Sequence, residues 1–228
     1  MEFSIKAAQP GRSKTGCAVV GVFETTKLSS PAMRLNEAAN GYIATLLRRG
    51  DMSGKTGSTL LLHEVPGVAA ERVLLVGLGK EADFSARQYR EAIAAAVRAV
   101  NGTGARDAEI HLTATKVNGH DAAWRTRQAV IAARETLYRF DAMKSRRETS
   151  EPALAQLTLV VEDKGELRSA QRGGEQGAAI ADGMVLTKDL GNLPPNVCTP
   201  SYLANQAREL AKSYGMKAQV FDLSLIHI

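Results

Sequence analysis

Residues 168–204 read RSAQRGGEQGAAIADGMVLTKDLGNLPPNVCTPSYLA, a segment rich in glycine and alanine that runs into two consecutive prolines. Its small residues recur at helical spacing, at Ala170, Gly173, Gly174, Gly177, Ala178 and Ala181. Each glycine costs a helix about 1 kcal/mol relative to alanine, so this helix needs stabilisation from tertiary packing. We therefore predict a long helix whose small-residue face lies against another backbone.

The two prolines mark the end of that helix and a junction between structural units. Pro194 and Pro195 donate no backbone hydrogen bond and disfavour helical conformation in the preceding residue, so the helix should end near Asn192. Thr199 is a natural N-cap, with Pro200 at the first position of a new amphipathic helix. We interpret Asn192, Pro194 and Pro195 as a domain junction.

The rest of the chain alternates short apolar runs with amphipathic segments. The runs predict strands at Phe3–Ala7, Gly16–Phe23, Ser58–Val65, Arg72–Leu78, Ala108–Thr113 and Ala155–Val161. Helical spacing predicts helices at Met33–Arg48, Ser85–Val100 and His120–Met143, the second opened by a capping box of Ser85 and Gln88. Lys144–Pro152 is predicted to be a loop, and Lys217–Phe221 the first strand of a further domain.

This order favours an α/β fold: a three-layer domain with a mixed, mostly parallel sheet flanked by helices, followed by a long linker helix and the start of a second α/β domain. The predicted domains are residues 1–166, the linker and Pro-Pro junction at 167–195, and residues 196–228.

Composition places the chain among ordinary globular proteins. It has 228 residues, of which 44% are hydrophobic and 23% charged. The first 16 residues lack the apolar core of a secretory signal, and no apolar run approaches the roughly 18 residues of a membrane span. We predict a cytoplasmic protein without a membrane partner. Cys17 and Cys198 lie outside any CxxC or Cys/His spacing, so both are expected to be reduced, metal-free thiols.

The net charge of +5 comes from one segment. Residues 116–147 carry eight Lys and Arg against three acidic residues, and the 21 basic and 21 acidic residues elsewhere cancel. On the predicted helix His120–Met143, Arg125 and Arg139, followed by Arg146, lie opposite the apolar stripe. Two interpretations stay open: a solvated helix face, or a surface on which these arginines contact DNA phosphates.

Several stretches resemble bacterial leucyl aminopeptidases. The most specific is KDLGNLPPNVCTPSYLA at 188–204, supported upstream by GYIATLLRRG at 41–50, TLLLH at 59–63, RVLLVGLGK at 72–80 and ETLY at 135–138. The resemblance spans roughly residues 3–221 and implies the family's N-terminal domain, its linker helix and the opening of its catalytic domain. It also implies a homohexamer, and some members of the family bind DNA.

The reaction implied by the resemblance is removal of the N-terminal amino acid from peptides by a water held between two divalent metal ions, manganese or zinc. The family's metal-binding motifs, Gly-Lys-Gly leading into Phe-Asp-Ser-Gly-Gly and Asn-Thr-Asp-Ala-Glu-Gly-Arg, have no counterpart in this sequence. The four histidines are dispersed and unpaired in sequence, at positions 63, 111, 120 and 227. We therefore assign no catalytic and no metal-binding residue, and expect the chain alone to be inactive, as a truncated portion of an aminopeptidase.

The Gly77–Lys80 turn offers a weaker, third possibility, a phosphate of a nucleotide-like ligand. It has neither the four residues between glycines nor the following Ser or Thr of a P-loop, and it lacks the third glycine of a dinucleotide fingerprint. A plain turn between strand and helix is the favoured interpretation.

Overall fold

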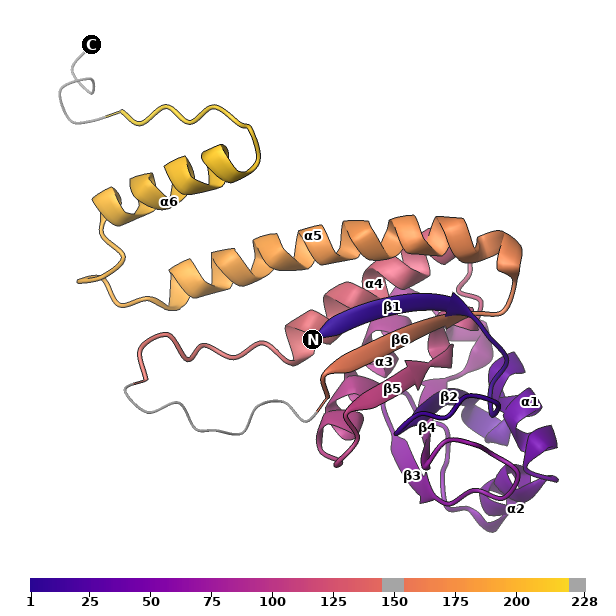
Figure 1. The fold of residues 1–228 in the computed structure, drawn as a ribbon. Coiled ribbons are helices and arrows are strands. Elements are labelled where there is room, and N and C mark those ends of the chain that lie inside the picture. Colours follow the sequence, from indigo (N-terminus) through magenta and orange to yellow (C-terminus); the bar gives the residue numbers. More distant parts are fainter. Residues whose placement is uncertain (145–153, 222–228) are drawn as a thin grey trace. The chain divides into compact units, whose positions relative to one another are not determined.

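The computed structural model describes residues 1–144 and 154–221. In these ranges the strands form one sheet in the order β1-β6-β5-β2-β4-β3, in which β3 runs antiparallel to β4 and all other pairs are parallel (Figure 1). The strands are β1 (Glu2–Ala7), β2 (Ala18–Phe23), β3 (Thr59–His63), β4 (Arg72–Gly79), β5 (Asp107–Ile110) and β6 (Gln156–Val161). The predicted α/β fold with a mixed, mostly parallel sheet is confirmed.

The helices follow the strands in the predicted alternation. They are α1 (Ser30–Ala38), α2 (Tyr42–Arg49), α3 (Ala86–Asn101), α4 (Ala122–Thr136), α5 (Leu167–Asn192) and α6 (Pro200–Ser213), with short 3-10 turns η1 (Glu24–Thr26), η2 (Glu81–Asp83), η3 (His111–Ala114) and η4 (Lys164–Glu166). The predicted capping box at the start of α3 is present, with Ser85 as N-cap and Gln88 as its partner.

The chain divides into two compact units. The first comprises Met1–Tyr138 with Glu148–Asp182 and contains the sheet and α1 to α4; the second comprises Arg139–Arg147 with Gly183–Ile228 and contains α6. Helix α5 begins in the first unit and ends in the second.

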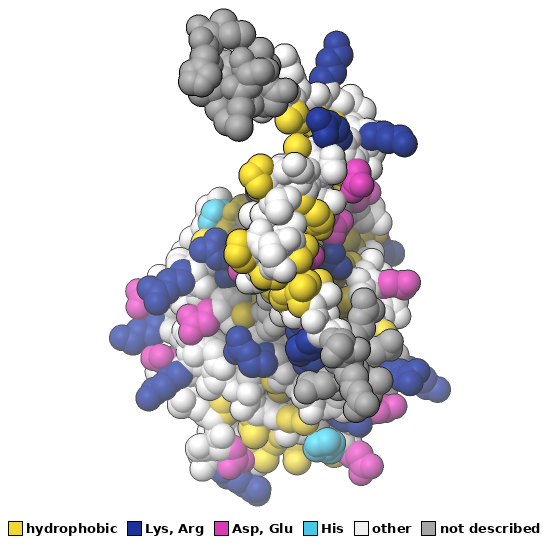
Figure 2. Space-filling view, turned by 90° about the vertical axis from the view of Figure 1, so that its left-hand side faces the viewer, with side chains coloured by type: hydrophobic (Ala, Val, Ile, Leu, Met, Phe, Trp, Pro, Cys, Tyr) yellow, Lys and Arg dark blue, Asp and Glu magenta, His cyan; other side chains and the backbone are white. Residues whose placement is uncertain are grey.

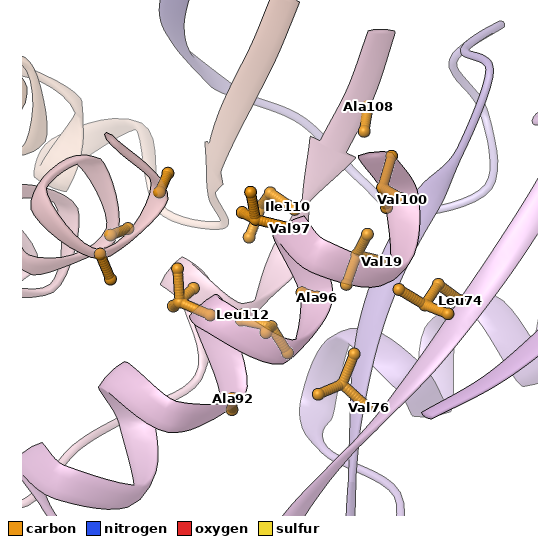
Figure 3. Close-up of a cluster of buried hydrophobic side chains, with 14 of the residues drawn as sticks. Val19, Leu74, Val76, Ala92, Ala96, Val97, Val100, Ala108, Ile110 and Leu112 are labelled. Carbon is orange, nitrogen blue, oxygen red and sulfur yellow. The ribbon is translucent and has the colours of Figure 1, made fainter. Parts of the chain in front are cut away.

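Two apolar layers hold the sheet between helices. Alternate residues of the buried strand β2 point to opposite faces, as the period of two requires. Val19 packs with α3 and α4, and Val20 packs with α1 and α2. Figure 3 shows the first layer, where Ala96, Val97 and Val100 of α3 meet side chains of β2, β4 and β5. The buried apolar run at Gly16–Phe23 therefore lies inside the sheet, as predicted.

Four predicted elements differ in the structure. The prediction of a single helix at Met33–Arg48 is wrong. Asn40 and Gly41 adopt left-handed φ values of 50° and 81°, and this break separates α1 from α2. The strand predicted to reach Thr113 ends at Ile110, since the Thr113 hydroxyl donates to the carbonyls of Ile110 and Val160 and the chain turns into η3.

The other two differences concern helix and strand ends. Helix α4 stops at Thr136, not Met143, although no glycine or proline follows to signal the end. Lys217–Phe221 forms no strand, since a strand requires hydrogen bonds to a neighbouring strand. The loop predicted at Lys144–Pro152 lies outside the described residues from position 145 onward.

One charged pair crosses the buried part of the sheet. Lys6 of β1 reaches over β6 to Glu109 of β5, whose residue is only 4% exposed. His111 Nε2 lies 3.4 Å from the other carboxylate oxygen of Glu109. Burial raises the pKa of Glu109, but hydrogen bonds from His111, Lys6 and Ser13 outweigh burial and lower that pKa to about 2. The folded protein therefore holds Glu109 ionised.

This pair makes stability depend on pH in a defined direction. A lowered carboxyl pKa contributes stability above the ordinary value of 4.5, and that contribution is lost as the pH falls toward about 2. We predict that Glu109→Gln lowers the free energy of unfolding at pH 7 by about 1 to 3 kcal/mol, since the Lys6 ammonium loses its charged acceptor. Urea unfolding at pH 7 and pH 3 measures this. A destabilisation that is as large at pH 3 as at pH 7 would contradict the assignment.

Candidate functional site

The small-residue face of α5 packs against α4 and β1 of the first unit. A Cβ atom at Gly173 would lie 2.1 Å from the carbonyl oxygen of Ala123, and one at Gly177 would lie 2.8 Å from that of Arg127. These distances leave no room for a side chain, so the two helices touch backbone to backbone. The predicted close approach is confirmed, and its partner is α4.

Polar contacts flank this seam. Arg127 Nη1 donates to Gln176 Oε1 at 3.0 Å, and Arg134 forms an ion pair with Asp182. Gly174 stands over Ile5 of β1, where an added Cβ would lie 2.4 Å from Ile5 Cδ1. The helix is thus fixed to the first unit from Ala170, which is buried, as far as Asp182.

Arg125 is a structural residue. It is 4% exposed, and its guanidinium donates to the carbonyls of Thr113 at 2.9 Å and His120 at 3.2 Å. A third donor reaches Glu166 Oε2 at 2.9 Å, in the turn just before α5. The side chain joins α4, η3 and η4 inside the protein. The prediction that Arg125 lies on an exposed basic face is therefore wrong.

Of the other two predicted DNA contacts, the structure describes only Arg139. Arg139 is exposed but follows the end of α4, so it shares no helix face with residue 125. Arg146 lies outside the described residues. On the face shown in Figure 2, Lys and Arg side chains are interspersed with Asp and Glu side chains. The DNA interpretation now rests on the net charge of residues 116–147 alone.

The predicted junction has regular local structure. Helix α5 ends at Asn192, and the amides of Val197 and Cys198 both donate to the carbonyl of Pro194 at 2.9 Å. The Thr199 side chain accepts from the amide of Tyr202 at 3.3 Å and caps α6. The helix end near Asn192 and the Thr199 cap match the sequence prediction.

The prediction of a turn at Gly77–Lys80 is wrong, because residues 77–79 are the end of strand β4, and the amides of both glycines already have acceptors in the protein. The amide of Gly77 donates to the carbonyl of Ser58 at 2.8 Å, and that of Gly79 donates to the carbonyl of Gly54 at 2.9 Å. Amides that already have acceptors inside the protein are not free to bind a phosphate. The connection from β4 to α3 is made by the residues after Gly79, which include η2.

The ionisable residues singled out from the sequence lie apart from one another. His63 is exposed on β3, and the ring of His120 stacks on Trp124 with centroids 3.7 Å apart. Cys17 is buried, which raises its pKa to about 12 and leaves the thiol protonated and unreactive. Within residues 1–144 and 154–221 there is no group of three or more His, Cys, Asp or Glu side chains able to hold a metal ion. His227 lies beyond the described ranges.

The described residues therefore do not fit the two-metal centre implied by the resemblance, because that chemistry requires closely grouped carboxylates. We derive no catalytic step from them. The part of the chain that is described also has no helix long and apolar enough to cross a membrane.

A crevice lies at the carboxyl ends of the strands of the first unit. It has a volume of about 550 Å³ and is lined by the segments that follow β2, β4, β5 and β6. Phe23, Ser29, Phe84, Thr115 and Glu162 are among its lining residues. The crevice was missed at the level of sequence, because its residues come from four separate loops and form no motif. The only signal was their shared position, just after successive buried strands.

Comparison with known proteins identifies the family. The model of the cytosol aminopeptidase family, N-terminal domain, matches residues 19–147, which is more than half of the chain. The chain belongs to the cytosol aminopeptidase family. The resemblance noted in the sequence is thereby confirmed.

Two curated relatives of this family align with almost the whole chain. A probable cytosol aminopeptidase of Dechloromonas aromatica (strain RCB) is 48% identical over 222 residues, which are 97% of this chain and 45% of the relative. One from Chromobacterium violaceum is 46% identical over 220 residues, which are 96% of this chain and 42% of the relative. The chain thus spans less than half the length of these aminopeptidases.

Solved structures share the fold. A mutant of tomato leucine aminopeptidase matches with a TM-score of 0.75 at 22% identity, over 94% of this chain and 43% of that one. The bottromycin maturation enzyme BotP, in a complex with Mn, matches with a TM-score of 0.65 at 27% identity, over 88% and 37% of the two chains.

The contact between α5 and α4 predicts opposite effects for two glycines of one helix. Gly173→Ala places a methyl group on the Ala123 backbone and should destabilise the first unit by about 1 to 3 kcal/mol. Gly183→Ala meets nothing within 4 Å and should leave stability unchanged or raise it by up to about 1 kcal/mol, the helix preference of alanine.

The sole tryptophan, Trp124, lies next to Ala123 on α4, so its fluorescence reports unfolding at the contact. Urea titrations of both variants and the parent chain give the comparison. Equal midpoints for all three proteins would show that α5 does not touch α4 in solution.

Proposed function

We propose that this chain is the N-terminal, non-catalytic portion of a cytosolic leucyl aminopeptidase, an exopeptidase that releases N-terminal amino acids from peptides. In this proposal, residues 1–166 form the N-terminal domain, residues 167–195 are the linker helix and junction, and residues 196–228 begin the peptidase domain. The observation that carries it is the family match over residues 19–147, on a chain that spans 45% of its first curated relative.

We place the two divalent metal ions of the proposed reaction, manganese or zinc, in the part of the protein that the longer relatives have and this chain does not span. Two findings support this. The described residues group no metal ligands, and BotP, which was solved in complex with Mn, is a longer protein of which only 37% aligns with this chain. The chain's own contribution is then to position and stabilise the assembly.

Exposed apolar side chains on α6 are an argument for a domain that packs against this helix. Leu203 is 44% exposed and Leu210 is 37% exposed, and both lie on the apolar stripe of this helix. Large apolar side chains at helical spacing need a partner surface. We propose that the peptidase domain of the complete enzyme covers them, and that the enzyme assembles as a homohexamer in the cytoplasm.

A peptidase assay tests the proposal. The purified 228-residue chain should not hydrolyse a leucyl anilide when manganese or zinc is added, because we place the metal ligands outside it. The aminopeptidase of Dechloromonas aromatica, purified and assayed in parallel, is the positive control. Hydrolysis by the chain that survives repurification and is abolished by a chelator would place a catalytic centre within these residues and overturn the proposal.

A further inference from the structure

The crevice at the strand ends occupies the switch point of the sheet. Strands β2 and β5 are neighbours, but the chain leaves β2 through α1 and α2 to β3, which lies on the β4 side of the sheet. It leaves β5 through α4 to β6, which lies on the other side. Two connections that depart in opposite directions leave a gap between them, which is where open α/β sheets bind ligands. The gap is widened here because β2 pairs with β5 only as far as Val19, opposite Ile110, and then continues for four more residues to Phe23.

The charges around the crevice are balanced. Its charged lining residues are Lys27 and Lys116 on one hand and Glu81 and Glu162 on the other. Lys27 pairs with Glu81, whereas no carboxylate of the described residues lies within ion-pair distance of Lys116. Glu162 accepts from the Ser30 hydroxyl at 3.3 Å and pairs with Arg34 at 3.1 Å, and its side chain faces the start of α1. A carboxylate in that position repels a phosphate anion. It favours a ligand that carries a positive group as well as a negative one.

A buried hydroxyl lies beside the crevice. Thr115 lines the crevice and is 7% exposed, and its Oγ1 has no hydrogen-bond partner among the residues that the structure describes. A buried hydroxyl without a partner is costly, so such an atom calls for an explanation. The next residue, Lys116, is exposed and lines the same crevice with an ammonium group, a donor suited to a carboxylate.

The floor of the crevice is apolar. The rings of Phe23 and Phe84 meet edge to face, with centroids 5.5 Å apart, and Leu28 and Met33 line the same space. A volume of about 550 Å³ lies within the range of about 300 to 1,000 Å³ that small-molecule sites occupy.

We propose that this crevice binds a free α-amino acid with an apolar side chain. Lys116 receives its carboxylate, Glu162 receives its ammonium group, and its side chain lies on the Phe23 and Phe84 rings. Amino acids are also the product class of the proposed aminopeptidase, and the site would let product act on the N-terminal domain. Binding itself does not require that activity, so a failure here leaves the proposed function untouched.

Nuclear magnetic resonance titration of the ¹⁵N-labelled 228-residue chain tests the proposal. L-Leucine should shift the amide signals of residues 28–30 and 114–118, and should bind more tightly than L-leucinamide, which lacks the carboxylate, or 4-methylpentanoate, which lacks the ammonium group. Lys116→Ala should weaken leucine binding at least about tenfold, the loss of one charge-assisted hydrogen bond. Lys14→Ala, which changes another exposed lysine outside the crevice lining, should leave the affinity unchanged.

Thermal midpoints of both variants establish that they are folded. The proposal is overturned if leucine causes no shifts up to its solubility limit, if the shifts fall elsewhere in the chain, or if Lys116→Ala binds as tightly as the parent. It is also overturned if inorganic phosphate shifts the same amides while leucine does not, because the crevice would then be an anion site.

Discussion

The contact between the backbones of α5 and α4 is the constraint on which the arrangement of this chain depends. At Gly173 and Gly177 the two helices approach so closely that no Cβ atom fits between them. Contact at this range requires glycine, and glycine lowers the intrinsic stability of a helix. Packing against α4 must therefore stabilise α5. The consequence is that α5, as far as Asp182, belongs to the same compact unit as the sheet.

Arg125 reinforces the same arrangement from inside. Its three donors hold the turn after β5, the turn before α4 and the turn before α5, so the segments leading into both helices share one buried cation. Tyr89 of α3 adds a fourth tie by donating its hydroxyl to the Arg125 carbonyl at 2.8 Å. A cation used in this way serves structure, so Arg125 does not contribute to a basic surface.

The sequence predicted those features that depend on local patterns. The buried strand at β2, the capping box at Ser85 and the Thr199 cap were visible because periodicity and caps act over a few residues. The break between α1 and α2 had a signal too, the turn dipeptide Asn40-Gly41, which the strong helical spacing around it concealed. The burial of Arg125 and the strand-end crevice had no local signal. Both depend on which loops the strand order of the sheet brings together. The order β1-β6-β5-β2-β4-β3 cannot be predicted from the residue spacing within any single segment.

Hydrogen exchange measured by mass spectrometry on the 228-residue chain tests most directly whether α5 is an integral part of the N-terminal domain. Helix amides exchange when their structure opens, so segments that open together exchange at the same slow rate. We expect peptides from residues 170–182 of α5 to exchange as slowly as those from α4, and Gly173→Ala to accelerate exchange in the α5 peptides. Rapid exchange in residues 170–182 while α4 stays protected would contradict this, because the helix would then be only a tether.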